Sequence, residues 1–211
     1  MFKINATCFK KNKRVFFSLM AFAAIALTFI IFLNPAIAGD KKNKKTNPRV
    51  AMDTTMGKII IELWPDKAPV TVKNFLDYAD ASFYDNKIFH RVIPGFMIQG
   101  GGFDKNLKKY ETKPPIKNEA GNSMKNNRGT IAMARTNVVD SATCQFFINL
   151  KNNDFLNQRD KSARGFGYAV FGKVISGMDV VDKIAASPTT RMGGHGNVPV
   201  TPVIIKSVKK L

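Results

Sequence analysis

From Arg49 to Leu211 the sequence consists of short apolar runs separated by Gly, Pro and Asn, and only two stretches show helical periodicity. The apolar runs do not alternate regularly with helices, as they would in a parallel α/β sheet. This order predicts a mainly β domain. A closed antiparallel barrel of about eight strands, capped by two α-helices, fits the pattern best.

Local patterns give the bounds of these elements. Residues 49–53 and 58–63 are expected to form a hairpin, and six further strands are expected at residues 88–93, 96–100, 129–134, 145–150, 168–175 and 203–208. Pro69 marks the start of the first helix, because proline is favoured at the first helical position. Its apolar face comprises Val72, Phe75, Leu76 and Ala79. The second helix is expected at residues 178–186, with Val181, Ile184 and Ala185 facing inward.

Residues 1–38 have the pattern of a signal peptide. A basic start precedes an apolar run that begins at Val15 and ends at Leu33, and Ala36-Ile37-Ala38 is the small-x-small pattern that signal peptidase accepts. We therefore expect cleavage after Ala38 and a periplasmic or otherwise exported protein. The alternative is an inner-membrane anchor, because the 19 residues of the run (15–33) could span a bilayer as a helix.

Residues 39–48 contain four lysines and no apolar residue, which predicts a flexible basic tether with possible weak contact to a membrane surface. Residues 49–211 then form one domain. The formal net charge is +18, but nine of the 33 basic residues lie in residues 1–48 and the others are scattered, so nucleic-acid binding is not favoured. Cleavage would leave Cys144 as the only cysteine, so no disulfide within the chain is expected.

The sequence lacks the residues that many kinds of catalysis need. It has two histidines, no spacing typical of a metal site, no nucleophile elbow and no phosphate loop or dinucleotide fingerprint. Gly100-Gly101-Gly102 is interpreted as a turn after a strand, and residues 192–197 as a plain loop that holds His195. We expect neither a metal nor a cofactor.

Two stretches nevertheless carry polar and aromatic residues on predicted strands. In Phe89-His90-Arg91-Val92-Ile93-Pro94-Gly95-Phe96-Met97-Ile98-Gln99, alternation places Phe89 with Arg91 on one face and directs His90 away from Arg91, as a packed and hydrogen-bonded residue. In Cys144-Gln145-Phe146-Phe147, it places Gln145 with Phe147 and turns Cys144 toward the barrel interior. A guanidinium, two amides, aromatic rings and a thioether can therefore converge on one barrel surface.

These motifs resemble those of a known family. FHRVIPGFMIQGG, GTIAMAR, CQFFI, DFLN and YAVFGKVISGMDVVDKI, in this order, are similar to the cyclophilin-type peptidyl-prolyl cis/trans isomerases, in their exported bacterial branch, from about Val50 to the C-terminus. The resemblance implies an enzyme that accelerates rotation about X-Pro bonds in unfolded or partly folded proline-containing polypeptides and assists the folding of exported proteins. We expect it to act as a monomer.

The resemblance also implies a role for individual residues. Arg91 matches the catalytic arginine and Gln99 its hydrogen-bonding partner. The pocket for the proline ring matches Phe96, Met97, Phe147 and Leu156. Positions beside the substrate backbone match Ala134, Arg135 and Gln145. Two further substrate-binding positions depart from the common pattern, with Phe155 in place of a tryptophan and Tyr168 in place of a histidine.

A binding module without catalysis is the principal rival interpretation. Such a module would keep the pocket but would have no need of the arginine. Because isomerisation only requires rotation about an amide with partial double-bond character, a permanently charged donor next to an apolar pocket is sufficient chemistry. The presence of Arg91 therefore favours the enzyme.

Overall fold

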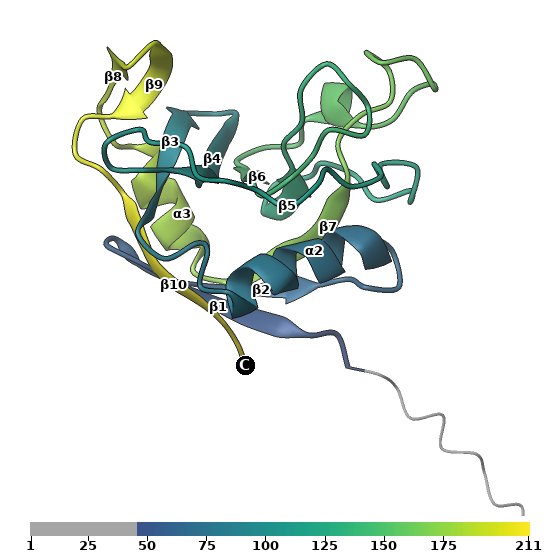
Figure 1. Ribbon diagram of the computed structural model, residues 1–211, viewed down its shortest axis with the longest axis horizontal. Helices are drawn as coiled ribbons and strands as arrows, with labels where there is room; N and C mark the ends of the chain where they lie inside the picture. The colour runs from purple at the N-terminus through teal and green to yellow at the C-terminus, as the bar shows by residue number, and fades with distance from the viewer. Residues whose placement is uncertain (1–45) are drawn as a thin grey trace, which may run out of the picture. The chain divides into compact units, whose positions relative to one another are not determined.

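The computed structural model describes residues 46–211, which form the predicted barrel (Figure 1). Eight strands close in the order β1-β10-β3-β4-β6-β5-β7-β2, and every neighbouring pair is antiparallel. The mainly β architecture with two helices is confirmed. The predicted signal peptide, its alternative as an anchor and most of the tether lie outside the described residues. Within the described residues, no helix is both long and apolar enough to cross a membrane.

The barrel strands are β1 (Arg49–Thr54), β2 (Gly57–Leu63), β3 (Lys87–Ile93), β4 (Met97–Asp104), β5 (Thr130–Met133), β6 (Phe146–Asn149), β7 (Val170–Ser176) and β10 (Ile204–Lys210). The helices are α2 (Pro69–Asp80), the short 3-10 helix η1 (Asp154–Leu156) and α3 (Met178–Ala185). A separate two-stranded sheet pairs β8 (Thr189–Met192) with β9 (His195–Pro199). The first hairpin and both long helices lie where the sequence predicts them, within a few residues.

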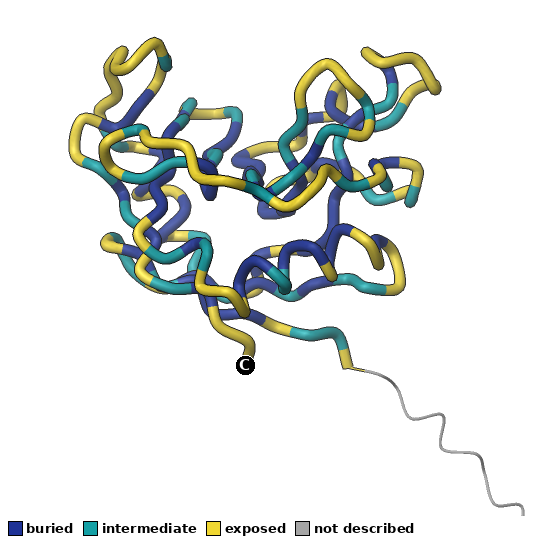
Figure 2. Tube along the Cα trace, in the orientation of Figure 1, coloured by how far each residue is buried: buried dark blue, intermediate teal, exposed yellow. Residues whose placement is uncertain are grey.

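The barrel interior is filled by apolar side chains that alternate along each strand. Phe75 of α2 packs there against Tyr84, Phe146 and Phe171, at ring centroid distances of 5.2 to 5.7 Å. Figure 2 shows this buried interior in dark blue, with exposed residues concentrated in the loops. Cys144 belongs to the same core, and burial raises the pKa of its thiol. The prediction that it faces inward is confirmed.

Two predictions about connections were wrong. Gly100-Gly101-Gly102 is not a turn but lies inside β4, and residues 192–197 are not a plain loop, because His195 begins β9. Gly193 and Gly194 have φ values of 57° and 81° between β8 and β9, which suits a tight hairpin turn. The two strands are mostly exposed and polar, so they lack the apolar alternation by which strands are predicted.

The domain begins slightly before the predicted boundary at Arg49. Asn47 Nδ2 donates to Glu62 Oε1 at 3.3 Å, and the Leu63 N–H donates to the Pro48 carbonyl at 2.8 Å. The last residues of the predicted tether therefore lie along β2.

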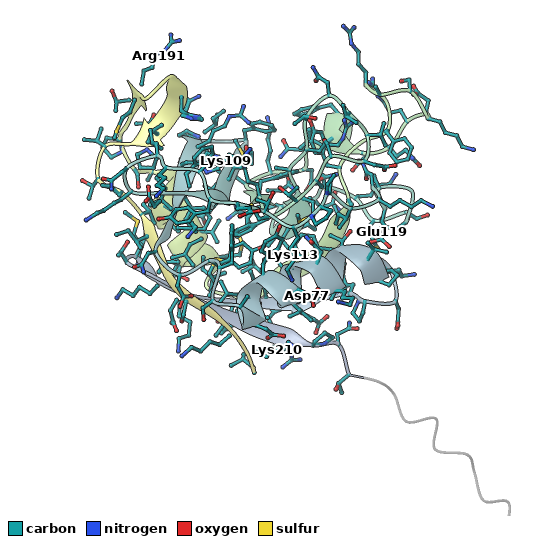
Figure 3. All side chains as sticks on the ribbon, viewed as in Figure 1. Asp77, Lys109, Lys113, Glu119, Arg191 and Lys210 are labelled. Atoms are coloured by element: carbon teal, nitrogen blue, oxygen red, sulfur yellow. The ribbon has the colours of Figure 1, made fainter. Side chains whose placement is uncertain are left out.

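A distant carboxylate caps the N-terminus of α2. Ala68 at the N-cap position has no side chain that can accept a hydrogen bond, and Pro69 supplies no N–H. Instead Glu119 accepts from the Val70 N–H at 3.2 Å and from the Thr71 N–H and hydroxyl at 2.8 and 2.7 Å. Figure 3 shows Glu119 beside this end of α2.

We expect Glu119→Ala to lower the free energy of unfolding by about 1 to 2 kcal/mol, the range measured for loss of an N-cap acceptor. Urea denaturation monitored by circular dichroism measures this loss. Glu111→Ala is the matched control, because Glu111 is exposed and makes no hydrogen bond or ion pair within residues 46–211. Equal stability of Glu119→Ala and the unaltered protein would contradict the capping role.

Candidate functional site

One cavity of about 530 Å³ opens on the outer face of the barrel. Its base is formed by side chains from β3, β4 and β6. Two segments rise from the barrel in Figure 1; one contributes residues 194–197 to the cavity lining and the other contributes Tyr168. We call residues 189–199 the hairpin arm and residues 157–168 the loop arm. Ten of the eleven predicted site residues line this cavity: Arg91, Phe96, Met97, Gln99, Ala134, Arg135, Gln145, Phe147, Leu156 and Tyr168.

Strand alternation separates the cavity floor from the barrel interior. Phe146 points inward, whereas Phe147 points outward into a second apolar cluster with Met97, Leu156 and Val170. Tyr168 packs edge-on against Phe147 at a centroid distance of 5.7 Å. The floor is therefore apolar and rigidly packed, as a site for a proline ring requires.

Arg91 belongs to a chain of hydrogen bonds that runs from β3 to β4 and on to the residue before β6. Its Nη1 donates to Gln99 Oε1 at 3.3 Å, and Gln99 Nε2 donates to Gln145 Oε1 at 2.9 Å. The guanidinium carbon lies 6.0 Å from the centre of the Phe96 ring. Arg91 is half-buried, and this bond is the only one that its side chain donates within residues 46–211. Most of its five N–H donors are therefore available to a ligand.

The prediction that Phe89 and Arg91 share a face was wrong, because β3 contains a bulge. Phe89 pairs with Gly100 and Arg91 with Gln99, so two steps on β3 match one on β4. The extra residue breaks the alternation. Phe89 enters the main core, while His90 and Arg91 both line the cavity.

The predicted environment of His90 is correspondingly wrong in part. His90 is buried as expected, but its Nδ1 has no hydrogen-bond partner. Its ring packs against Phe103 at 4.7 Å and lies 6.3 Å from the His195 ring. Burial, together with the nearby His195, lowers the His90 pKa to about 4. His90 is therefore neutral at pH 7.

A network of buried asparagines supports one wall of the cavity. Asn153 Nδ2 donates to the Phe96 carbonyl at 2.9 Å and to Asn149 Oδ1 at 2.8 Å, and Asn126 Nδ2 donates to the Leu156 carbonyl at 3.2 Å. These bonds link two segments, the turn that contains Phe96 and the 3-10 helix η1. No residue of this network was predicted, because an isolated asparagine in sequence is more typical of a turn than of a core.

Arg135 acts on the protein backbone. Its three nitrogens donate to the carbonyls of Gly167, Thr136 and Ala163 at 2.8 to 2.9 Å, and its guanidinium lies 4.9 Å from the centre of the Tyr168 ring. The side chain therefore holds the loop arm against the cavity. The resemblance places this position beside the substrate backbone, and the structure adds that two of its side-chain nitrogens bind the loop arm.

Phe155 is the one predicted site residue that does not line the cavity. It is 60% exposed and stacks on Phe96, with a centroid distance of 5.6 Å and an interplanar angle of 26°. The tight turn of η1 directs Leu156 into the floor and its neighbour Phe155 to the outside.

Six lining residues were not predicted: His90, Phe103, Gly194, His195, Gly196 and Asn197. Four of them belong to the hairpin arm. The Gly193-Gly194 pair between Met192 and His195 was the available sequence signal, since such a pair is typical of a two-residue hairpin turn.

Gly102 makes room for Gln145. A Cβ at position 102 would lie 2.6 Å from Gln145 Cγ and Cδ. These atoms belong to a flexible side chain, so Gly102→Ala should move Gln145 at little cost to the fold. We expect Gly102→Ala to lower catalytic efficiency on X-Pro peptides about tenfold, equivalent to one lost hydrogen bond of about 1.4 kcal/mol.

A double-mutant cycle tests this prediction. If both changes act through Gln145, Gly102→Ala combined with Gln145→Ala should lose no more activity than Gln145→Ala alone. The melting temperature of Gly102→Ala should stay close to that of the unaltered protein. Additive losses, or a large fall in melting temperature, would refute the assignment.

Comparisons with known proteins agree with this geometry. The family described as "Cyclophilin type peptidyl-prolyl cis-trans isomerase/CLD" matches residues 49–210. Peptidyl-prolyl cis-trans isomerase B of Escherichia coli is 59% identical over 159 residues, which cover 75% of this chain and 97% of the relative. Peptidyl-prolyl cis-trans isomerase A of Dickeya dadantii is 50% identical over 187 residues, covering 89% and 94%.

A solved structure shares the fold. The crystal structure of a cyclophilin type peptidyl-prolyl cis-trans isomerase from Cryptosporidium parvum superposes with a TM-score of 0.64 at 27% identity, covering 78% of this chain and 98% of the other. The barrel and the cavity beside Arg91 are thus those of a proline isomerase. The chain belongs to the cyclophilin-type peptidyl-prolyl cis-trans isomerase family, and its similarity to the bacterial enzymes is high.

Proposed function

We propose that this isomerase acts on X-Pro bonds of exported proteins, outside the cytoplasm, and thereby assists their folding. The isomerase activity follows from the family, whereas the exported substrates and the location are inferred. The observation that carries the inference is the sequence of residues 1–38, in which a basic start and an apolar run are followed by Ala36-Ile37-Ala38, upstream of the tether and the isomerase domain.

The extent of one match supports a shared N-terminal segment. The match to the Dickeya dadantii isomerase extends over 187 residues, or 89% of this chain, whereas residues 49–211 number only 163. The similarity must therefore extend into the region before Arg49. The relative has a corresponding segment there.

Isomerisation of an X-Pro bond requires only rotation about that bond. Rotation about the X-Pro bond must overcome a barrier of about 20 kcal/mol that arises from amide resonance. As the amide twists, the prolyl nitrogen becomes pyramidal and gains a lone pair. The Arg91 guanidinium, which remains charged at any ordinary pH, can donate a hydrogen bond to that lone pair. Such a bond favours the twisted amide over both planar forms, which is the requirement for catalysis.

The rest of the cavity holds the substrate while the bond turns. The apolar floor at Met97, Phe147 and Leu156 binds the proline ring, and the chain from Arg91 through Gln99 to Gln145 fixes the donor in place. Donors fixed before the reaction lose no energy to reorganisation during it. All these residues come from one chain, so we propose that a monomer is sufficient for activity.

Cell fractionation with N-terminal sequencing tests the proposed location. We expect the protein in the periplasmic fraction, with Gly39 as its first residue. The isomerase in that fraction should accelerate the proline-limited refolding phase of an exported protein. Recovery of an intact N-terminus in the membrane fraction would favour the anchor through residues 15–33, and recovery in the cytoplasm would overturn the proposal.

A further inference from the structure

We infer that this isomerase prefers X-Pro segments with acidic residues on both sides of the proline, because both arms of the cavity carry positive charge. The inference rests on the isomerase function above and specifies the class of substrate. It concerns charged residues outside the proline pocket. None of them belongs to the hydrogen-bond chain of Arg91, Gln99 and Gln145.

The hairpin arm and the loop packed on it supply the first group of cations. Arg191 is exposed on β8 and lies near the end of the hairpin in Figure 3; its neighbour Met192 pairs with His195, which lines the cavity. The loop at residues 104–109 lies against this arm, since a Cβ at Gly193 would come within 2.8 Å of Leu107. This loop adds three exposed lysines, Lys105, Lys108 and Lys109.

Lys109 lies next to a residue of the cavity lining. Its backbone forms a bridge with Phe103, a residue of the cavity lining. The position of this lysine is therefore fixed by the same strand that carries Gln99.

The loop arm supplies the second group, on the other side of the cavity. Arg135 lines the cavity and its Nη2 donates to the Ala163 carbonyl at 2.8 Å, so the exposed Arg164 is one residue away from a contact of the cavity lining. Arg159 and Lys161 are exposed on the same arm.

Few carboxylates oppose these charges. Residues 104–109, 157–168 and 189–199 contain seven exposed cations but only two acids, Asp104 and Asp160. Both acids are engaged by their own loops. Asp104 accepts from the N–H groups of Asn106 and Lys108 at 2.9 Å and from the Tyr110 hydroxyl at 3.0 Å, and Asp160 accepts from the Ser162 N–H at 2.8 Å.

None of the seven cations forms an ion pair within the part of the chain described by the structure. The ion pairs there involve other lysines and arginines, chiefly beside α2, α3 and the first hairpin. The side chains on the two arms are therefore available to a bound peptide.

An extended peptide would reach both arms. It advances about 3.3 Å per residue, so residues two to four positions from a bound proline pass over the rims of the cavity. An exposed ion pair contributes about 0.2 to 1 kcal/mol, or roughly 1.4- to 5-fold in affinity for each acidic residue. Positive potential at the mouth of a cleft also speeds the association of acidic ligands at low salt.

Matched peptides test the inference. Three Ala-Pro peptides would differ only in carrying Glu, Gln or Lys at the second and third residues on each side of the dipeptide. At low ionic strength we expect catalytic efficiency to be about tenfold higher for the Glu peptide than for the Lys peptide, with the Gln peptide between. The difference should shrink in about 0.5 M salt, because screening removes exposed interactions.

Paired variants assign the preference to the arms. Lys161→Gln with Arg164→Gln, and Lys109→Gln with Arg191→Gln, should each reduce the Glu-to-Lys ratio about threefold, a change that corresponds to two exposed pairs. Lys206→Gln with Lys209→Gln removes the same charge from exposed positions on β10, which lies away from the arms in Figure 1, and should leave the ratio unchanged.

Two results would overturn the inference. One is equal efficiency for the Glu and Lys peptides by a protein that turns over the Gln peptide normally. The other is an equal loss of preference in the β10 variant, which would assign the effect to net charge. Failure to isomerise the Gln peptide would count against the isomerase function, and is thereby distinguished from failure of the charge preference.

Discussion

Arg91→Ala is expected to lower catalytic efficiency by a few hundredfold, about 3 to 4 kcal/mol, the scale on which one preorganised donor acts. The reason is that the guanidinium meets its strongest acceptor, the pyramidal prolyl nitrogen, only in the twisted amide. Its loss therefore removes transition-state stabilisation and leaves ground-state contacts with the apolar floor intact. Turnover in a protease-coupled assay and peptide affinity by calorimetry should be measured on the same preparation.

Two further variants separate this mechanism from a general loss of binding. Arg91→Lys should rescue activity poorly, because an ammonium lacks the planar fork that both meets Gln99 and faces the substrate. Phe147→Ala should weaken peptide binding more than Arg91→Ala does, because it opens the cavity floor. If Arg91→Ala turned over substrate at a near-normal rate, the domain would be better described as a proline-peptide binder.

Acidification from pH 7 to pH 4 is expected to lower the free energy of unfolding by about 3 kcal/mol through His90 alone. The pKa of His90 is lowered from 6.5 to about 4, because its burial and the neighbouring His195 and Arg91 disfavour the charged ring. Between these two values the unfolded chain binds more protons than the folded chain. Stability is therefore fully present above pH 6.5 and is lost as the pH falls toward 4.

Urea denaturation at a series of pH values measures the effect, and His90→Gln provides the comparison. Whatever its absolute stability, the variant should show a smaller slope of stability against pH between 4 and 6.5. Titration of the buried His90 ring followed by NMR spectroscopy gives an independent measurement of its pKa. A midpoint near 6.5 for His90 in the folded protein would contradict the prediction.

Strand alternation predicted much of the site, and a single bulge accounts for its main error. Side chains on regular strands alternate between faces, so Gln145 and Phe147 were correctly placed together, and Cys144 was correctly placed in the barrel interior. The bulge at β3 depends on its pairing with β4, a partner whose register the local sequence does not specify. The positions of Phe89 and His90 were therefore beyond any argument from alternation.

The periodicity of the sequence determined the barrel, its two helices and the buried Cys144, and the resemblance of its motifs to a known family indicated ten of the residues that line the cavity. Only the tertiary structure decided which distant groups meet. It placed Glu119 on the start of α2, the hairpin arm beside His90 and the donors of Arg135 on the loop arm. Such contacts join residues far apart in sequence, and the hydrogen bonds and packing that fix them form only when the whole barrel closes.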